Sequence, residues 1–350
     1  MPHDHGEWPQ ISDRLGEIFC LTFIRNSDDA DALRRMGALS DTVGQRTLGD
    51  LTKEAQEFDH GYPTVAAAAR LDGWTVMIEP GGFEGSDTAL LSAVSEGSEA
   101  MSVLHHAYAS NRFGYAAAGR LVTGFDPSWP GRRWGTHPDR LLSVMDEVGM
   151  TPDDPDAGYV EGTLPALELA GRITGVGVPL RVLDEPLLSA WIEPWFSDAV
   201  PPPVSNGDPL MHAVTAAPAQ VRPAVIVAEL RRLATLLRVA DAPGLADTLA
   251  AAESGGAAVP AEGELGQQVR AWLADSRRAG TSLNDHSARH RMNDTERNHA
   301  FLRGWWVQAL RAVRWPDSPT AAAVALRPLV SGPPALRDPH AQEAILAMLG

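Results

Sequence analysis

Two histidines and an aspartate in the last third of the chain have a spacing that could hold a metal ion. His286, His290 and Asp294 follow one another at intervals of four residues, which would align them if that stretch is helical. Such ligands suit Zn²⁺ or another first-row metal. However, neighbouring arginines crowd the position with positive charge, and Asn293 is typical of a helix N-cap, which indicates a break there. We therefore predict a solvated polar segment without a metal ion.

The same segment belongs to the one basic region of the sequence. Residues 270–315 hold nine arginines and four acidic residues, a composition that could bind the phosphates of RNA or DNA. Docking against the acidic first half of the chain is the interpretation we favour, and binding of a partner protein is a further alternative. The residues of a nucleic-acid or metal site would be His286, Arg289, His290, Arg291, Arg297 and His299.

A loop rich in proline and glycine carries the second candidate site. Its residues are Trp129, Arg132, Arg133 and Trp134. Tryptophan and arginine are enriched at the energetic centres of protein interfaces, and guanidinium groups can bind a carboxylate or phosphate through paired hydrogen bonds. Alternatively, the tryptophans fold back and cover the edge of a sheet. Both interpretations stay open, and the loop is our candidate protein-binding site.

Two further patterns favour structural roles. The GGFEGS run at residues 81–86 lies between a predicted strand and a predicted helix, where backbone N–H groups could bind an anion. It matches neither the dinucleotide-binding pattern nor the P-loop pattern, and Glu84 would repel phosphate, so we predict a structural turn. His105 and His106 are neighbours on a predicted strand and point to opposite faces, so they cannot share one metal ion.

The sequence lacks the motifs of several common enzyme classes. It contains no serine nucleophile elbow, no His-Glu-x-x-His and no Cys-x-x-Cys. Cys20 is the only cysteine, no apolar run approaches the roughly 18 residues of a membrane span, and no signal peptide is evident. We expect a cytoplasmic protein without a cofactor. Whether the protein is an enzyme stays uncertain, and the sequence favours a protein without catalytic activity.

Charge is distributed unevenly along the chain. Residues 1–200 hold 31 acidic and 14 basic residues, a net charge of −17, whereas residues 201–350 hold 14 acidic and 15 basic residues. The acidic half would repel nucleic acid and anionic membranes and could attract a basic protein partner. A simpler alternative is that the charge keeps the protein soluble.

The elements that position these residues are clearest from Trp74 to Asp126. This stretch predicts a strand, a glycine-rich turn, a helix, a strand, a turn and a long strand over 113–125. Asp72 and Gly73 predict a tight hairpin in front of it. Hairpins mixed with helices indicate an α+β fold, with a mixed or antiparallel sheet and helices on one face.

Past residue 198 the pattern becomes helical. Three consecutive prolines followed by Asn-Gly predict a linker over 199–209. Apolar residues then recur with a helical period, and Asn293 with Glu296 forms a capping-box pattern. We predict an α+β domain over 1–198 and an all-α helical bundle over 210–350.

The first domain contains several segments that carry a family resemblance, and the most specific is GWTVMIEPGGFEG. The residues are Phe19-Cys20, Thr22-Phe23, Gly73 to Pro80, Gly82 to Ser86, His137 to Leu142, Met145, Val148-Gly149 and Ala170 to Gly175. Through them the domain resembles, over about residues 7–196, an uncharacterised family found mainly in actinomycetes. The resemblance implies an actinomycete origin and the limits of the domain. It implies no activity, and the helical domain resembles no known family.

The sequence as a whole favours a non-catalytic binding protein. Its acidic α+β domain would present a surface to another protein, in an immunity, regulatory or adaptor role. The alternative is an enzyme or binding protein that acts on nucleic acid or nucleotides through residues 270–315.

Overall fold

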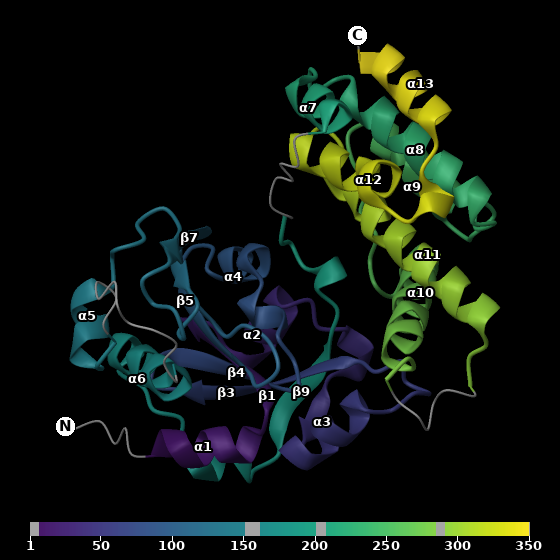
Figure 1. Ribbon diagram of the computed structural model, residues 1–350. Helices are drawn as coiled ribbons and strands as arrows, with labels where there is room; N and C mark the ends of the chain where they lie inside the picture. The colour runs from purple at the N-terminus through teal and green to yellow at the C-terminus, as the bar shows by residue number, and fades with distance from the viewer. Residues whose placement is uncertain (1–6, 151–161, 201–207, 285–290, 350) are drawn as a thin grey trace. The chain divides into compact units, whose positions relative to one another are not determined.

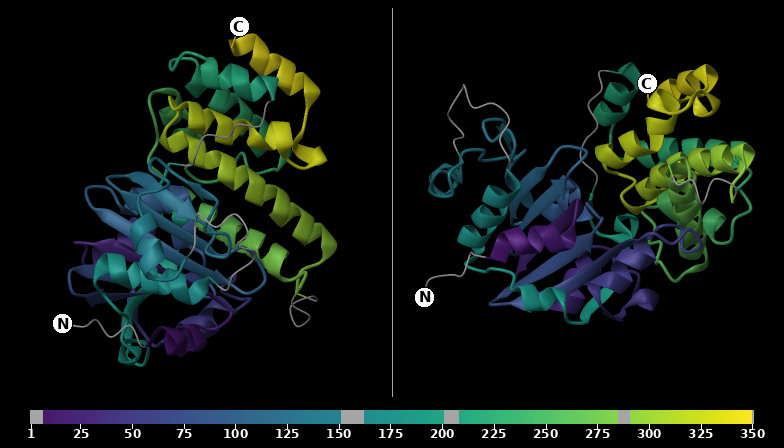
Figure 2. Two further views of the ribbon diagram at one scale, coloured as in Figure 1. Left: turned by 60° about the vertical axis from the view of Figure 1, so that its left-hand side comes forward. Right: turned by 60° about the horizontal axis from the view of Figure 1, so that its bottom comes forward.

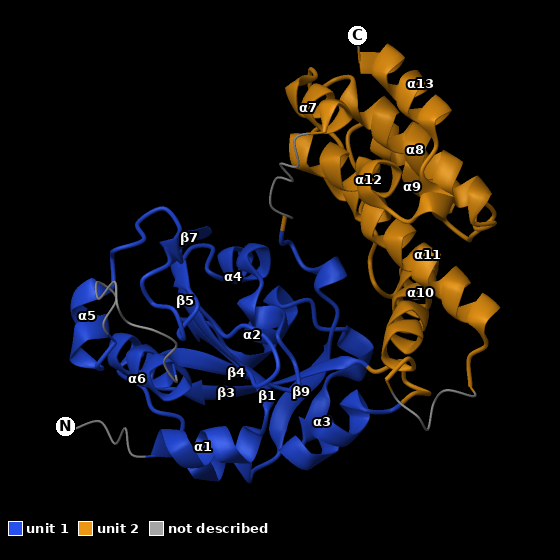
Figure 3. Cartoon of the chain, in the orientation of Figure 1, with its two compact units in different colours: residues 1–57, 63–199 blue, residues 58–62, 200–350 orange. Residues whose placement is uncertain are grey.

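The structure is a computed structural model that describes residues 7–150, 162–200, 208–284 and 291–349. The chain forms two compact units (Figure 3). Unit 1 contains residues 1–57 and 63–199, and unit 2 contains residues 58–62 and 200–350. Most of the predicted linker, residues 201–207, lies outside the described residues.

Unit 1 is built around a nine-stranded sheet in the order β2-β9-β3-β4-β1-β5-β6-β7-β8 (Figure 1). Every pairing between the described strands is antiparallel. The strands are β1 (Ile18–Arg25), β2 (Gly44–Arg46), β3 (Thr64–Leu71), β4 (Trp74–Pro80), β5 (Glu99–His106), β6 (Arg112–Ala117), β7 (Arg120–Phe125), β8 (Arg133–Trp134) and β9 (Leu187–Ile192). The predicted α+β class is confirmed.

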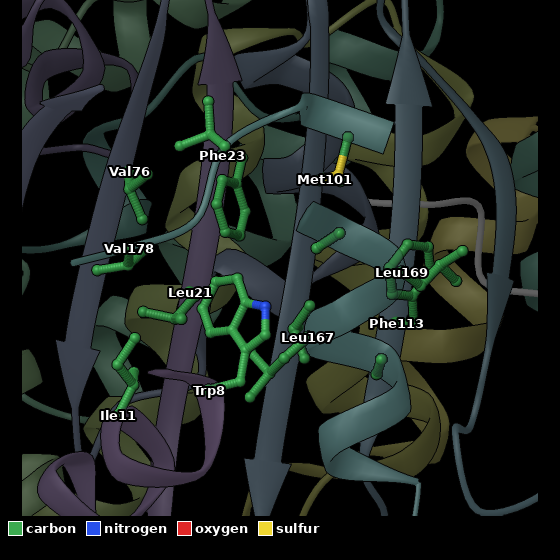
Figure 4. Close-up of a cluster of buried hydrophobic side chains, with 14 of the residues drawn as sticks. Trp8, Ile11, Leu21, Phe23, Val76, Met101, Phe113, Leu167, Leu169 and Val178 are labelled. Atoms are coloured by element: carbon green, nitrogen blue, oxygen red, sulfur yellow. The ribbon is translucent and has the colours of Figure 1, made fainter. Parts of the chain in front are cut away.

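Helices cover both faces of this sheet. They are α1 (Trp8–Leu15), α2 (Asp29–Arg35), α3 (Leu48–Ala55), α4 (Thr88–Val94), α5 (Leu142–Glu147) and α6 (Thr163–Thr174). One core joins α1, α5 and α6 to one face, and Figure 4 shows Trp8, Leu21, Phe23 and Leu167 within it. A second core joins α2 and α4 to the other face. The expectation of helices on one face only is therefore wrong.

The two-sided cover follows from the sequence of β1. Phe19 and Phe23 enter the core with α1 and α6, while Ile24 enters the core with α2 and α4. Successive side chains of a strand point to opposite faces, so an uninterrupted apolar run has to be covered on both. Burial on both sides also leaves Cys20 and Thr22 inaccessible to solvent.

Two tight turns set the strand pairing. The predicted Asp72-Gly73 hairpin is confirmed: both residues have positive φ, 41° and 85°, between β3 and β4. The predicted long strand over 113–125 is instead a second hairpin, β6 and β7. Ala118 (φ 48°) and Gly119 (φ 76°) form its turn, without the usual Asn or Asp that would mark it in the sequence.

Unit 2 is helical. Its helices are α7 (Pro209–Ala216), α8 (Arg222–Leu236), α9 (Leu245–Glu253), α10 (Glu264–Thr281), α11 (Asp294–Leu310), α12 (Pro319–Ser331) and α13 (Pro339–Leu349). Helices α10 and α11 pack along one another (Figure 2). The rings of Trp272 and Trp306 meet edge to face, with their centroids 4.9 Å apart. The predicted capping box of Asn293 and Glu296 is present at the start of α11. No helix in the described part of the chain is long and apolar enough to cross a membrane.

The segment Phe58–Tyr62 completes unit 2, although it lies between α3 and β3 in the sequence. Arg278 Nε donates to Phe58 O at 2.8 Å, and Arg278 Nη2 donates to Asp59 O at 2.7 Å. Arg291 forms an ion pair with Asp59 at 3.1 Å and lies over the Phe58 ring. The basic region thus uses several of its arginines inside unit 2.

Candidate functional site

One end of the sheet in unit 1 gathers loops that are far apart in the sequence. Gly81 N–H donates to Ile18 O at 2.8 Å, and Ala107 N–H donates to Glu17 O at 2.9 Å. The start of β1 therefore lies beside the ends of β4 and β5. The antiparallel register brings the start of β6 and the end of β7 to the same end. The loops at this end are residues 81–87, 107–111 and 126–132.

Each of these loops exposes one large aromatic side chain. Phe83, Tyr108 and Trp129 keep 54%, 72% and 43% of their surface exposed. The guanidinium of Arg132 lies over the Trp129 ring at 5.9 Å. Phe83, Tyr108, Trp129 and Arg132 are called the aromatic surface below. The set spans four strand spacings, from β4 to β7, which is roughly 19 Å at the usual spacing of about 4.8 Å between strands.

Hydrogen bonds hold two of the loops in place. Asn111 Oδ1 accepts from the backbone N–H of His106 at 2.8 Å, and Asn111 Nδ2 donates to Ser128 Oγ at 3.3 Å. The Tyr108 backbone N–H donates to His106 Nδ1 at 3.2 Å, and the two rings meet edge to face. The loops that carry Tyr108 and Trp129 are thus connected through Asn111. A surface ordered in advance loses little conformational entropy on binding.

A fully buried carboxylate holds the third loop. Glu79 is 0% exposed, and its Oε2 and Oε1 accept the backbone N–H groups of Glu84 and Gly85, both at 2.9 Å. A Cβ atom at Gly85 would lie 2.0 Å from Thr22 Oγ1, closer than non-bonded atoms approach. Only glycine fits there. The turn over 81–87 is therefore shaped around Glu79, and it carries Phe83 outward.

Burial governs the ionisation of the groups under this turn. It raises the pKa of Glu79 to about 8, and the negative charge of Glu84 acts in the same direction against the two backbone donors. Burial also raises the pKa of the Cys20 thiol well above its usual range. Because thiolate is the reactive form of cysteine, this buried thiol is a poor nucleophile. The cluster is a structural support for the turn.

The predicted Trp/Arg loop divides into two parts. Trp129 and Arg132 belong to the aromatic surface. Arg133 is only 10% exposed at its side chain, and it donates to Asp139 Oδ1 at 2.8 Å and to Pro130 O at 3.0 Å. Trp134 lies over Gly124, where an added Cβ would come within 2.9 Å of the indole nitrogen. Arg133 and Trp134 form β8 at the edge of the sheet, and Trp134 keeps 41% of its surface exposed.

Comparison with known proteins gives a family match for the part of the chain that contains these loops. Residues 3–188 match a family of unknown function, DUF6461. The chain belongs to the DUF6461 family. The match runs from the N-terminus into β9 and contains Glu79 and the aromatic surface, whereas unit 2 beyond β9 has no family match. No curated protein and no solved structure matched the chain.

Within the DUF6461 region, the two neighbouring arginines should behave differently. Arg133→Ala is expected to lower the free energy of unfolding by about 1–2 kcal/mol, because it removes hydrogen bonds from a largely buried guanidinium. Arg132→Ala should change it by less than about 0.5 kcal/mol, as is usual for an exposed side chain. Urea unfolding followed by circular dichroism would measure both. Equal effects would contradict this division of the loop.

The remaining candidate residues do not form a site in the described structure. His286, Arg289 and His290 lie outside the described residues. Arg291 is paired with Asp59, as above, and Arg297 bonds to Asp294 and to Met292 O. His299 is exposed on α11. Within the described ranges, no cluster of His, Cys, Asp or Glu is placed to bind a metal ion.

The predictions for the GGFEGS turn and for His105 concern the DUF6461 region. In the GGFEGS turn, the N–H groups of Glu84 and Gly85 are taken by Glu79, which agrees with a structural turn. His105 Nδ1 lies 2.8 Å from Thr163 Oγ1 at the start of α6, and its ring packs against Phe19. His105 therefore joins α6 to the sheet.

Sequence reasoning missed three residues of this region: Phe83, Tyr108 and Glu79. Phe83 stands between glycines in a turn, where the adjacent residues cannot bury an aromatic ring. This pattern indicates an exposed aromatic side chain. Tyr108 lies two residues before the Ser110-Asn111 turn after β5 and carries a similar signal. Glu79 gave no signal, because an alternating strand pattern assigns a glutamate to solvent.

Proposed function

We propose that this chain is a non-catalytic protein-binding protein whose aromatic surface contacts the partner. The supporting observation is the exposure of Phe83, Tyr108 and Trp129 together at one end of the sheet. Large aromatic side chains and arginine supply much of the binding energy at protein interfaces. The loops that carry them are held by buried or intramolecular hydrogen bonds, so they need little rearrangement to bind.

The charge of the chain favours a basic partner. Residues 1–200 carry a net charge of −17, which attracts a positively charged protein from a distance and repels nucleic acid. Contacts at short range would then come from the aromatic surface, with Arg132 able to bind a carboxylate at its rim. We place this role in the cytoplasm, as an immunity, regulatory or adaptor protein, in keeping with the single buried cysteine and the expected actinomycete source.

The contacts inside unit 2 do not favour the alternative role in nucleic-acid binding. Arg278 and Arg291 of the basic region are engaged with Phe58 and Asp59. Recovery of nucleic acid with the purified protein, with an affinity that falls steeply with salt, would nevertheless support that alternative.

A variant with Phe83→Ser, Tyr108→Ser and Trp129→Ser tests the proposed surface. We expect it to lose at least about tenfold in partner affinity, because loss of one strong interface residue alone costs about 2 kcal/mol or more. Its melting temperature should change little, because these side chains are exposed. The measurement is quantitative affinity capture from a cell lysate, with mass spectrometry, followed by calorimetry with the recovered partner.

Phe301→Ser is the matched control, because Phe301 is also about half exposed but lies on α11 of unit 2. The control should bind the partner as the unchanged protein does. A partner that binds the triple variant equally well would contradict the proposal. So would turnover of a substrate that depends on these three side chains.

A further inference from the structure

We propose that Glu79 and the turn above it, residues 81–87, form a pH-sensitive latch that opens as Glu79 ionises and displaces Phe83 from the aromatic surface. The opening itself is a property of the free protein. Its effect on partner binding rests on the proposed function of the aromatic surface.

The geometry isolates Glu79 from water, because the residue has no exposed surface. Its carboxyl group lies under the turn, with one oxygen bound to Glu84 N–H and the other to Gly85 N–H. From β1, Cys20 and Thr22 close the other side, and a Cβ atom at Gly82 would already lie 2.9 Å from Glu79 Cβ. The ionisable groups that act on the pKa of Glu79 are Glu84 and Cys20, and neither supplies positive charge. The basic group on the turn is Arg112 at the start of β6, whose Nη1 donates to Ser86 O at 3.3 Å.

A buried carboxylate in this setting favours an open turn. Burial disfavours the charged form, and the negative charge of Glu84 adds to the effect. The two backbone donors partly offset this, but they leave the pKa at about 8 in the closed turn, against 4.5 for a solvated glutamate. The closed turn therefore holds its proton over a pH range in which an open, hydrated turn would have released it.

The direction of the pH effect follows from this difference. Between pH 4.5 and about 8 the closed state binds more protons than the open state, so a rise in pH favours opening. One proton is released, so the equilibrium constant for opening should rise about tenfold per pH unit across this range and level off above it. Protonation keeps Phe83 in place, and ionisation releases it together with Glu84 and Gly85.

The latch can be tested on the full chain without a partner. Hydrogen exchange of the amides of residues 81–87, divided by their intrinsic exchange rates, should report an opening constant about a hundredfold larger at pH 7.5 than at pH 5.5. The ¹³C signal of the Glu79 carboxyl group should titrate with a midpoint far above the usual value. Asp28 N-caps α2 in the same unit, and the corrected exchange of its partner Asp31 N–H should not change in this way.

Two variants separate the latch from a general loss of stability. Glu79→Gln carries no titratable group, so its opening constant should lose the pH dependence. Glu84→Gln should shift the titration of Glu79 to lower pH, because it removes a repelling charge. This second variant keeps the test decisive if the first fails to fold. A Glu79 carboxyl that titrates near 4.5, or a Glu79→Gln protein with the original pH dependence, would overturn the proposal.

The outcomes for the latch and for the binding surface are distinguishable. If residues 81–87 open with pH but the triple serine variant still binds its partner, the latch stands and the proposed surface is wrong. If the variant loses binding but the turn exchanges independently of pH, the surface stands and the latch is wrong.

Discussion

Gly85→Ala is expected to lower the melting temperature of the protein by several degrees. The added methyl group would lie 2.0 Å from Thr22 Oγ1 and 2.7 Å from Glu79 Oε1, so the turn has to move away from β1. Forcing atoms into a packed interior costs about 1–3 kcal/mol, and each kcal/mol lowers the melting temperature of a unit of this size by about 2–4 °C. Displacement of the turn would also lengthen the hydrogen bond from Gly85 N–H to Glu79 Oε1. Differential scanning calorimetry would measure the change.

Gly49→Ala provides the control for this experiment. Gly49 lies on the exposed side of α3 in the same unit, and the nearest atom to an added Cβ would be Thr47 Oγ1 at 3.8 Å. Alanine at an exposed helical position should be neutral or stabilise by up to about 1 kcal/mol. A Gly85→Ala protein as stable as the Gly49→Ala protein would show that the turn does not close tightly over Glu79.

Trp306→Ala should destabilise unit 2 by about 3–5 kcal/mol, the usual cost of removing a fully buried large aromatic side chain. The Trp306 ring has no exposed surface, meets Trp272 edge to face and donates from Nε1 to Leu230 O at 3.4 Å. Its removal leaves a cavity where α8, α10 and α11 meet. Guanidinium unfolding followed by near-ultraviolet circular dichroism would report the loss.

The neighbouring tryptophan gives a matched comparison. Trp305 precedes Trp306 on α11 but is partly exposed, with the guanidinium of Arg327 over its ring at 5.6 Å. Trp305→Ala should cost less than half as much, since a cation–π contact at a partly exposed site contributes about 0.5–1 kcal/mol. Similar losses for both substitutions would mean that the interior of unit 2 lies elsewhere.

Local patterns predicted much of the fold because they report local physics. The period-two alternation of Trp74 to Pro80 and the Asp72-Gly73 turn were sufficient for the hairpin of β3 and β4. The one-sided arrangement of helices was wrong because a continuous apolar strand was given too little weight as a sign of two covered faces. The hairpin at Ala118 and Gly119 was missed because alanine seldom adopts positive φ.

The candidate site was harder to predict because it is assembled by long-range pairing. Trp129 and Arg132 were recognised from residue type in a single loop. Phe83 and Tyr108 join them only through the register of β1 with β4 and β5, which brings Gly81 to Ile18. Composition alone does not determine which strand lies beside which. The distinction between Arg132 and Arg133 likewise depends on the position of Asp139.

The contribution of Phe58–Tyr62 to unit 2 has a consequence during synthesis on the ribosome. Arg277 donates to Gly61 O across a sequence separation of 216 residues. At about 5–20 residues per second, the segment is made roughly 10–40 s before that arginine. The close approach of Ala274 also requires glycine at position 61, because an added Cβ would lie 2.5 Å from the alanine methyl group. During synthesis, residues 58–62 must therefore remain without their contacts to α10 until that helix has been made. Cleavage of the finished chain near residue 200 would leave these residues on the N-terminal fragment, so it would not divide the chain into the two complete units.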